Sequence, residues 1–184
     1  GILDAPPADR YAQAERILRG LCEGLELIHS KGLIHRDLKP LNIMVSQKVG
    51  APVYAKVLDF GLAKPMKEAD DEQVTAKGTI IGSPLYMSPE QIFNEEVDHR
   101  SDIYSLGVLA FEMLTGRPPF VLEKNGHVRE LLKKHLTGTI PEMRSINPHS
   151  DAPPEVEFAV RRCLAKKSKD PNTDARKAYD LLLQ

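Results

Sequence analysis

The segment 101–115 constrains the fold most strongly, because apolar side chains cover nearly every face of the helix that it predicts. The apolar residues are Ile103, Tyr104, Leu106, Val108, Leu109, Phe111, Met113 and Leu114. A helix without a polar face belongs in the middle of a domain, surrounded by other elements. Gly116 ends the pattern, and Pro118-Pro119 prevents the helix from continuing. We therefore expect a mostly helical domain built around this segment.

Amphipathic patterns supply the elements that would surround this helix. Segment 10–31 carries apolar residues at helical spacing and is followed by Gly32, whereas Pro6 and Pro7 keep the preceding residues out of a helix. Further helices are expected at 126–136, 155–165 and 174–183. Short apolar runs at 33–34, 42–45 and 55–58 predict short strands that form a hairpin. The expected fold class is mainly α (α+β), with a small layer of strands.

Composition narrows the class of protein. The 184 residues, 41% of them hydrophobic, are enough for one domain, and the formal charge of -1 argues against nucleic-acid or anionic-membrane binding. No apolar run approaches the length of about 20 residues that a membrane span needs, and the first ten residues do not resemble a signal peptide. We interpret Cys22 and Cys163 as buried thiols of a cytoplasmic protein, with a disulfide as the alternative.

Chemistry-bearing side chains are concentrated in the string HRDLKPLN at 35–42 and in the string DFG at 59–61. Asp37 could orient a hydroxyl and accept its proton, and Lys39 could stabilise a transferred phosphoryl group. Asn42 and Asp59 offer the oxygen ligands that Mg²⁺ prefers. Taken alone, an aspartate in a loop usually caps a turn. We assign His35 the structural role of a buried, hydrogen-bonded residue. The combined strings favour phosphoryl transfer.

These strings, in this order, resemble the C-terminal lobe of a protein kinase over essentially the whole chain, 1–184. GSPLYMSPE at 82–90 and DIYSLG at 102–107 extend the resemblance. Lys39 is typical of serine/threonine kinases, and YMSPEQ at 86–91 is most similar to the bacterial, eukaryotic-like members of the family. The resemblance implies a catalytic loop at 35–42, an activation segment at 59–90, and a β-hairpin layer at the catalytic cleft.

The resemblance also implies the roles of single residues. Asp37, Lys39 and Asn42 would be catalytic, and Asn42 and Asp59 would bind Mg²⁺. The residues expected to contact ATP are Lys39, Asn42, Met44 and Asp59. Met44 would lie beneath the adenine ring. The alternative is that Met44 is a strand residue of the core, for which methionine is equally suitable.

Five further positions take their expected roles from the same resemblance. Asp102 would hold the backbone of the catalytic loop, and Ser83 would lie near the substrate hydroxyl. Arg36 precedes the catalytic aspartate, so a phosphate on Thr75 or Thr79 is expected to pair with it and order the loop; for each threonine, an unmodified polar residue is the alternative.

Glu90 departs from the pattern of the family. Kinases usually pair this glutamate with an arginine near the C-terminal end of the domain, and here Asp174 occupies that place, with Arg176 two residues later. Either Glu90 lacks its partner or Arg176 substitutes for the usual arginine.

The expected function is that of a serine/threonine kinase using ATP and Mg²⁺ to phosphorylate protein substrates. No Gly-x-Gly-x-x-Gly loop and no Val-Ala-Ile-Lys lysine occur in these residues, so we expect that they do not include an N-terminal lobe. In the natural protein that lobe would be the partner of this one in cis. The chain alone is therefore expected to be inactive. The alternative is a non-catalytic kinase lobe that serves as a protein-binding module.

Overall fold

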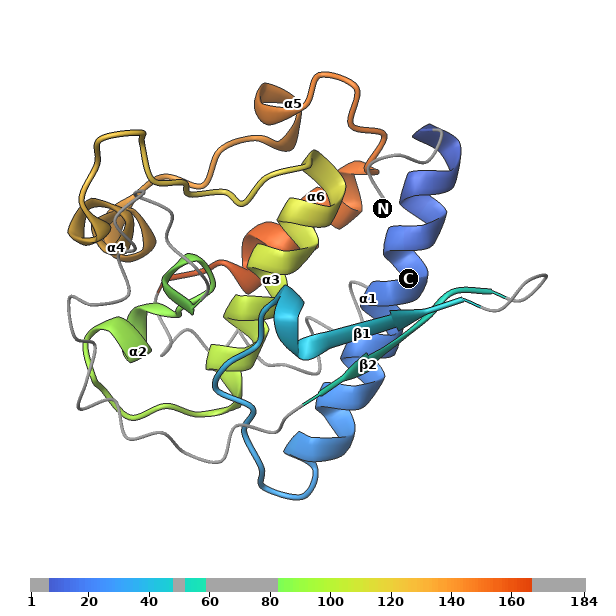
Figure 1. Ribbon diagram of the computed structural model, residues 1–184, viewed down its shortest axis with the longest axis horizontal. Helices are drawn as coiled ribbons and strands as arrows, with labels where there is room; N and C mark the ends of the chain where they lie inside the picture. Colours follow the sequence, from blue (N-terminus) through green and yellow to red (C-terminus); the bar gives the residue numbers. More distant parts are fainter. Residues whose placement is uncertain (1–6, 48–51, 59–82, 167–184) are drawn as a thin grey trace.

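The computed structural model describes residues 7–47, 52–58 and 83–166. Its elements are, in order, α1 (Pro7–His29), η2 (Pro40–Asn42), β1 (Ile43–Ser46), β2 (Tyr54–Val57), η5 (Ser83–Leu85), α2 (Pro89–Ile92), α3 (His99–Thr115), α4 (Val128–Thr137), α5 (Met143–Ile146) and α6 (Pro154–Cys163). The described residues are mostly helical and include one two-stranded antiparallel sheet, as Figure 1 shows. The predicted class, mainly α with a small strand layer, is confirmed.

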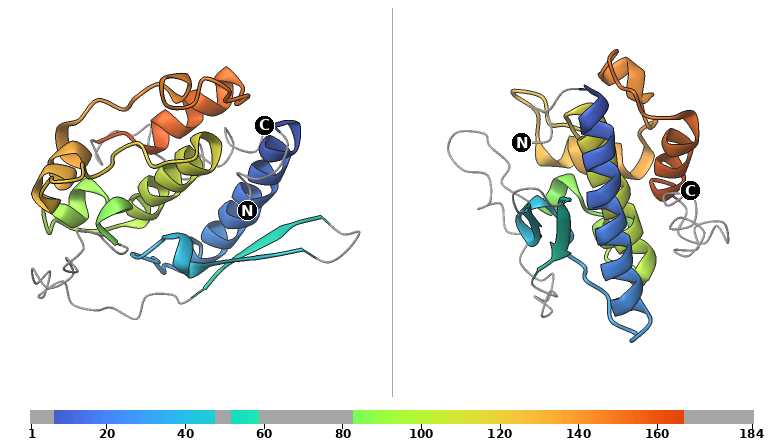
Figure 2. Two further views of the ribbon diagram at one scale, coloured as in Figure 1. Left: turned by 45° about the horizontal axis from the view of Figure 1, so that its top comes forward. Right: turned by 90° about the vertical axis from the view of Figure 1, so that its right-hand side faces the viewer.

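Helix α3 forms the centre of the fold, as its apolar faces predict. Its N-cap is Asp98, whose carboxylate accepts a hydrogen bond from the backbone N–H of Arg100 at 2.8 Å, and its C-cap is Gly116, with a left-handed φ of 92°. The helix is buried along most of its length and contacts both α1 and α6 (Figures 1 and 2). A Cβ atom at Gly107 would lie 2.7 Å from the Cβ of Cys163, so the close approach of α3 and α6 depends on this glycine.

Helix α1 connects this core to the sheet. One face of α1 is buried in the core through Ala14, Ile17, Leu18, Leu21, Cys22, Leu25 and Ile28. Strand β2 lies along another face (Figure 2), where a Cβ atom at Gly20 would come within 3.1 Å of the Ala55 carbonyl oxygen. The helix begins at Pro7, earlier than predicted, because proline is well suited to the first turn of a helix.

The hairpin has a defined inner and outer face. Its pairs are Ile43 with Val57, Met44 with Lys56, Val45 with Ala55, and Ser46 with Tyr54. Because side chains alternate along a strand, one face carries Ile43, Val45, Ala55 and Val57. The β2 part of this face lies against α1, where Val57 approaches Gly24, whereas Val45 remains exposed. The opposite face carries Met44, Ser46, Tyr54 and Lys56. The predicted strands at 42–45 and 55–58 are confirmed, each displaced by one residue.

The predicted strand at 33–34 is wrong. Leu33 donates its backbone N–H to the carbonyl of Ile28 at 3.0 Å, and the next residues, His35 and Arg36, donate theirs to the side chain of Asp102. These backbone groups therefore belong to a loop that is fixed by the end of α1 and by the carboxylate of Asp102. The short helices α2 and α5 were not predicted, and the helix expected at 174–183 lies outside the described residues. In the described part of the chain, no helix is long and apolar enough to cross a membrane.

Candidate catalytic loop

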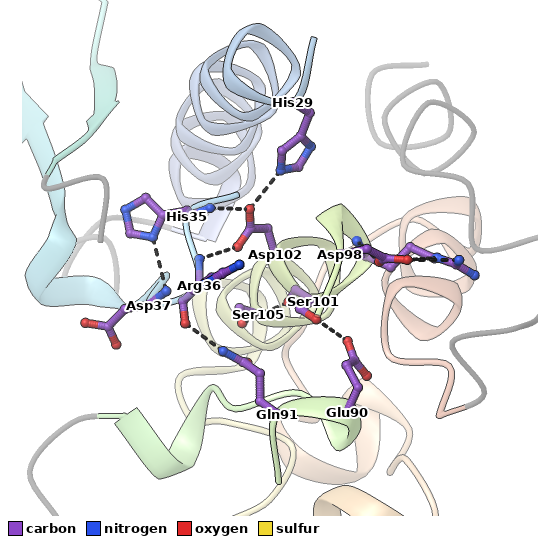
Figure 3. A network of polar contacts seen from close by, with 11 residues as sticks. His29, His35, Arg36, Asp37, Glu90, Gln91, Asp98, Ser101, Asp102 and Ser105 are labelled. Atoms are coloured by element: carbon purple, nitrogen blue, oxygen red, sulfur yellow. Dashed lines mark hydrogen bonds and ion pairs between the residues drawn. The ribbon is translucent and has the colours of Figure 1, made fainter. Parts of the chain in front are cut away.

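Asp102, in the first turn of α3, holds the loop that begins at His35. Its Oδ2 accepts hydrogen bonds from the backbone N–H of His35 and from Nε2 of His29, both at 2.8 Å. Its Oδ1 accepts from the backbone N–H of Arg36, also at 2.8 Å (Figure 3). The carboxylate is almost wholly buried, where polar groups need hydrogen-bond partners, and these contacts give partners both to the carboxylate and to its donors. Asp102 thus has the position that the resemblance implied, whereas His29 was not singled out from the sequence.

His35 links the loop to the end of β2. The ring is fully buried, and its Nε2 lies 2.9 Å from the carbonyl oxygen of Leu58. A carbonyl only accepts, so Nε2 carries the proton and Nδ1 accepts the backbone N–H of Asp37 at 3.3 Å. His35 therefore has the structural role that we predicted, and it holds the residue directly before Asp59.

The predicted catalytic side chains Asp37, Lys39 and Asn42 come together at one end of the loop. Nζ of Lys39 lies 2.6 Å from Oδ2 of Asp37. Nδ2 of Asn42 donates to the same oxygen at 3.1 Å and to the backbone oxygen of Asp37 at 2.7 Å. The turn η2, which Pro40 starts, brings Asn42 back over the loop. About two fifths of the Asp37 side chain (39%) is exposed, which leaves it accessible to a substrate.

The orientation of Asn42 fits the binding of a cation. The oxygens of Asp37 can only accept, so the NH₂ group of Asn42 faces them and the amide oxygen Oδ1 is directed elsewhere. That oxygen is the kind of ligand that Mg²⁺ takes. The second predicted ligand, Asp59, lies outside the described residues. Met44 is 39% exposed on the face of the hairpin away from α1, where a flat apolar ring could lie against it.

Gln91 is a further residue of this site that we did not single out from the sequence. Its Nε2 donates to the carbonyl oxygen of Arg36 at 2.7 Å (Figure 3). Arg36 has a φ of 66°, in the left-handed region that residues other than glycine rarely adopt. A small cavity of about 20 Å³ lies beside Arg36, Asp37 and Gln91. A larger groove of about 590 Å³ runs between α1 and β2, and its lining includes none of the predicted site residues.

The remaining predicted positions are only partly described. The carboxylate of Glu90 is buried and accepts a hydrogen bond from the hydroxyl of Ser101. Its alternative partner, Arg176, lies outside the described residues, as do Thr75 and Thr79. Ser83 begins η5, but its side chain is outside the described part of the chain.

Comparison with known proteins gives consistent matches. A family model described as "Protein kinase domain" matches residues 8–179. Serine/threonine-protein kinase pkn3 of Myxococcus xanthus is 40% identical over 156 residues, which cover 84% of this chain and 28% of that protein. Serine/threonine-protein kinase PknB of Mycolicibacterium smegmatis is 39% identical over 168 residues, which cover 89% of this chain and 24% of that protein. The chain thus spans about a quarter of the length of these curated relatives.

Proposed function

This chain belongs to the protein kinase family and is similar to its bacterial serine/threonine members, and from that membership we propose that the natural protein phosphorylates serine or threonine residues of other proteins. The phosphoryl donor is Mg-ATP. The observation that carries the proposal is the cluster of Asp37, Lys39 and Asn42 in one loop whose backbone is held by hydrogen bonds to a buried carboxylate. In this proposal residues 1–184 are the large lobe of the kinase, with the catalytic loop at 35–42 and the activation segment at 59–90.

The geometry of Asp37 and Lys39 supports the roles that this proposal gives them. The partly exposed carboxylate of Asp37 orients a substrate hydroxyl and accepts its proton as the new O–P bond forms and the bond to the leaving diphosphate breaks. The ammonium group of Lys39, 2.6 Å from that carboxylate, lies beside the reaction centre and stabilises the negative charge of the phosphoryl oxygens. Asn42 donates through its Nδ2 to Oδ2 of Asp37, the oxygen that Lys39 also contacts, and so helps to fix the carboxylate.

Asn42 and Asp59 have a role with both the cation and the nucleotide in this proposal. The Oδ1 of Asn42 and the carboxylate of Asp59 would hold Mg²⁺, which neutralises phosphate charge when bound. Met44, on the exposed face of the hairpin, would contact the adenine ring. The N-terminal lobe that covers the nucleotide in kinases would be supplied in cis by the natural protein.

Activation by phosphorylation is part of the same proposal. The side chain of Arg36 is exposed next to Asp37, where it could pair with a phosphate on Thr75 or Thr79. Phosphorylation should then raise the activity of the full-length protein. Full activity in the Thr75→Ala/Thr79→Ala double variant would show that neither threonine has this role.

An Asp37→Asn variant of the natural full-length protein tests the proposed function. Asparagine keeps the size of the side chain but cannot accept the hydroxyl proton, so phosphoryl transfer should be lost while Mg-ATP binding is largely retained. Asp151→Asn, at an exposed position away from the loop, is the matched control and should keep wild-type activity. Unchanged turnover in Asp37→Asn would refute the assignment. If the wild-type protein neither binds Mg-ATP nor transfers phosphate, a protein-binding module becomes the better explanation.

A further inference from the structure

We propose that Gln91 is a positioning residue of the catalytic loop, because its side chain fixes the peptide bond that carries Asp37. The inference rests on the proposed kinase function and extends it to a residue outside the catalytic loop. It starts from the hydrogen bond between Nε2 of Gln91 and the carbonyl oxygen of Arg36, at 2.7 Å, which joins residues 55 positions apart in the sequence.

The backbone of Arg36 needs such support. Its φ of 66° is sterically disfavoured for a residue with a Cβ atom, so it persists only where neighbouring groups hold it. Asp102 holds the N–H of Arg36 at 2.8 Å, and Gln91 holds its C=O at 2.7 Å. Both polar backbone groups of this residue are therefore fixed by side chains from α3 and α2.

The carbonyl of Arg36 belongs to the same planar peptide unit as the N–H of Asp37. That N–H points to Nδ1 of His35 at 3.3 Å, so the unit is held at both ends, by Gln91 and by His35. The orientation of this unit determines where the Cα of Asp37 lies and in which direction its carboxylate leaves the backbone. A change at Gln91 would thus be transmitted directly to the proposed base.

The amide of Gln91 is itself fixed at its other end (Figure 3 shows its side chain reaching the loop). The backbone N–H of Ser88 and its hydroxyl both lie near Oε1 of Gln91, at 3.0 and 3.1 Å. An N–H only donates, so Oε1 faces Ser88 and Nε2 must face Arg36. The residue is only 7% exposed. Gln91 thus connects the N-terminal capping box of α2 to the catalytic loop.

Capping alone would not require glutamine. Glutamate is equally suited to the third position of a capping box, because either side chain accepts from the N-cap N–H. Only glutamine also supplies a donor for the Arg36 carbonyl. A Gln91→Glu variant therefore separates the two roles, since it keeps the cap of α2 but turns a carboxylate oxygen toward a carbonyl oxygen.

The experiment compares the wild-type natural full-length protein with Gln91→Glu and Gln91→Met. Thr115→Val is the stability control: Thr115 is buried at the far end of α3, where its hydroxyl donates to the carbonyls of Phe111 and Arg117 at 2.8 and 2.9 Å. Two readouts are taken: kcat and KM for Mg-ATP and a protein substrate, and backbone amide hydrogen exchange in residues 35–38.

Both Gln91 variants should lower kcat by about 10-fold to about 100-fold, as expected for a misplaced catalytic group, with KM for Mg-ATP little changed. Amide exchange in 35–38 should increase in both variants and remain at the wild-type level in Thr115→Val. The ratio of Gln91→Glu to wild-type kcat should rise as the pH is lowered, because a protonated glutamate regains an O–H donor for the Arg36 carbonyl. A purely capping role would not produce that pH profile.

The outcomes distinguish this inference from the proposed function. Wild-type kcat and exchange in Gln91→Glu, in an active kinase, would overturn the positioning role and leave the kinase assignment intact. Conversely, faster exchange in the Gln91 variants of a protein that transfers no phosphate would support the fixation of the loop by Gln91 and overturn the proposed function.

Discussion

Replacing Asp102 by asparagine should release part of the catalytic loop, because one amide cannot accept hydrogen bonds on both sides. In the native protein, Oδ2 accepts from the His35 N–H and Oδ1 from the Arg36 N–H. Asparagine has a single oxygen, so in either orientation its NH₂ group faces one of these two N–H groups. The variant loses a hydrogen bond to a charged acceptor, which contributes about 1.5–3 kcal/mol, and leaves a buried donor unsatisfied. We therefore expect the free energy of unfolding to fall by about 2–4 kcal/mol.

Asp98→Asn provides the matched control at the start of the same helix. Asparagine caps a helix as well as aspartate does, and the ion pair of Asp98 with Arg100 is partly exposed to solvent, so the expected loss is below about 1 kcal/mol. Urea unfolding of the two variants and the wild type, followed by circular dichroism, gives the midpoints and slopes. Equal midpoints for Asp102→Asn and Asp98→Asn, with unchanged slopes, would refute the proposed role of Asp102 in holding the loop.

Three other parts of the fold give testable predictions. Burial lowers the pKa of His135 from 6.5 to about 4, so the unfolded chain binds more protons between these pH values. The contribution of neutral His135 to the free energy of unfolding should be fully present above about pH 6.5. It should fall by about 3 kcal/mol as the pH is lowered to 4. Unfolding measured at several pH values checks this prediction. If the free energy of unfolding of His135→Leu depended on pH as strongly as that of the wild type, the prediction would be wrong. Gly107→Ala should cost about 1–3 kcal/mol, since its Cβ would meet α6, whereas Gly24→Ala, where the nearest atom is 3.6 Å away, should gain up to about 1 kcal/mol. Thermal melts of the two variants measure both effects. If Gly107→Ala were as stable as the wild type, α3 and α6 would be less closely packed than the structure shows. Burial raises the pKa of both thiols, that of Cys163 to about 12, so alkylation by iodoacetamide at pH 8 should require unfolding; rapid labelling of the native protein would refute the burial of Cys22 and Cys163.

Local sequence patterns predicted the long elements and failed where distant residues decide the structure. The apolar faces of α3 and the alternating residues of the hairpin are properties of adjacent positions, so their existence could be predicted. The run Leu33-Ile34 has the composition of a strand, but the following N–H groups donate to Asp102, which lies far along the chain. Helix α2 is too short for a periodic pattern and depends on its capping box.

The same distinction applies to the site. Asp37, Lys39 and Asn42 lie within one short string, so their proximity could be predicted before the structure was known. His29 contacts Asp102 across 73 residues, and Gln91 contacts Arg36 across 55 residues, so neither contact has a local signal. The capping-box spacing of Ser88 and Gln91 was present in the sequence, but it indicates a helix start and not a contact with the catalytic loop.

The most direct test of the proposed kinase function is the identification of its product. The natural full-length protein would be incubated with Mg-ATP and a mixture of protein substrates, alongside its Asp37→Asn variant, and the phosphorylated residues mapped by mass spectrometry. Phosphoserine or phosphothreonine should appear with the wild-type protein and not with Asp37→Asn. Equal phosphorylation by both proteins, or none by a wild-type protein that binds Mg-ATP, would contradict it.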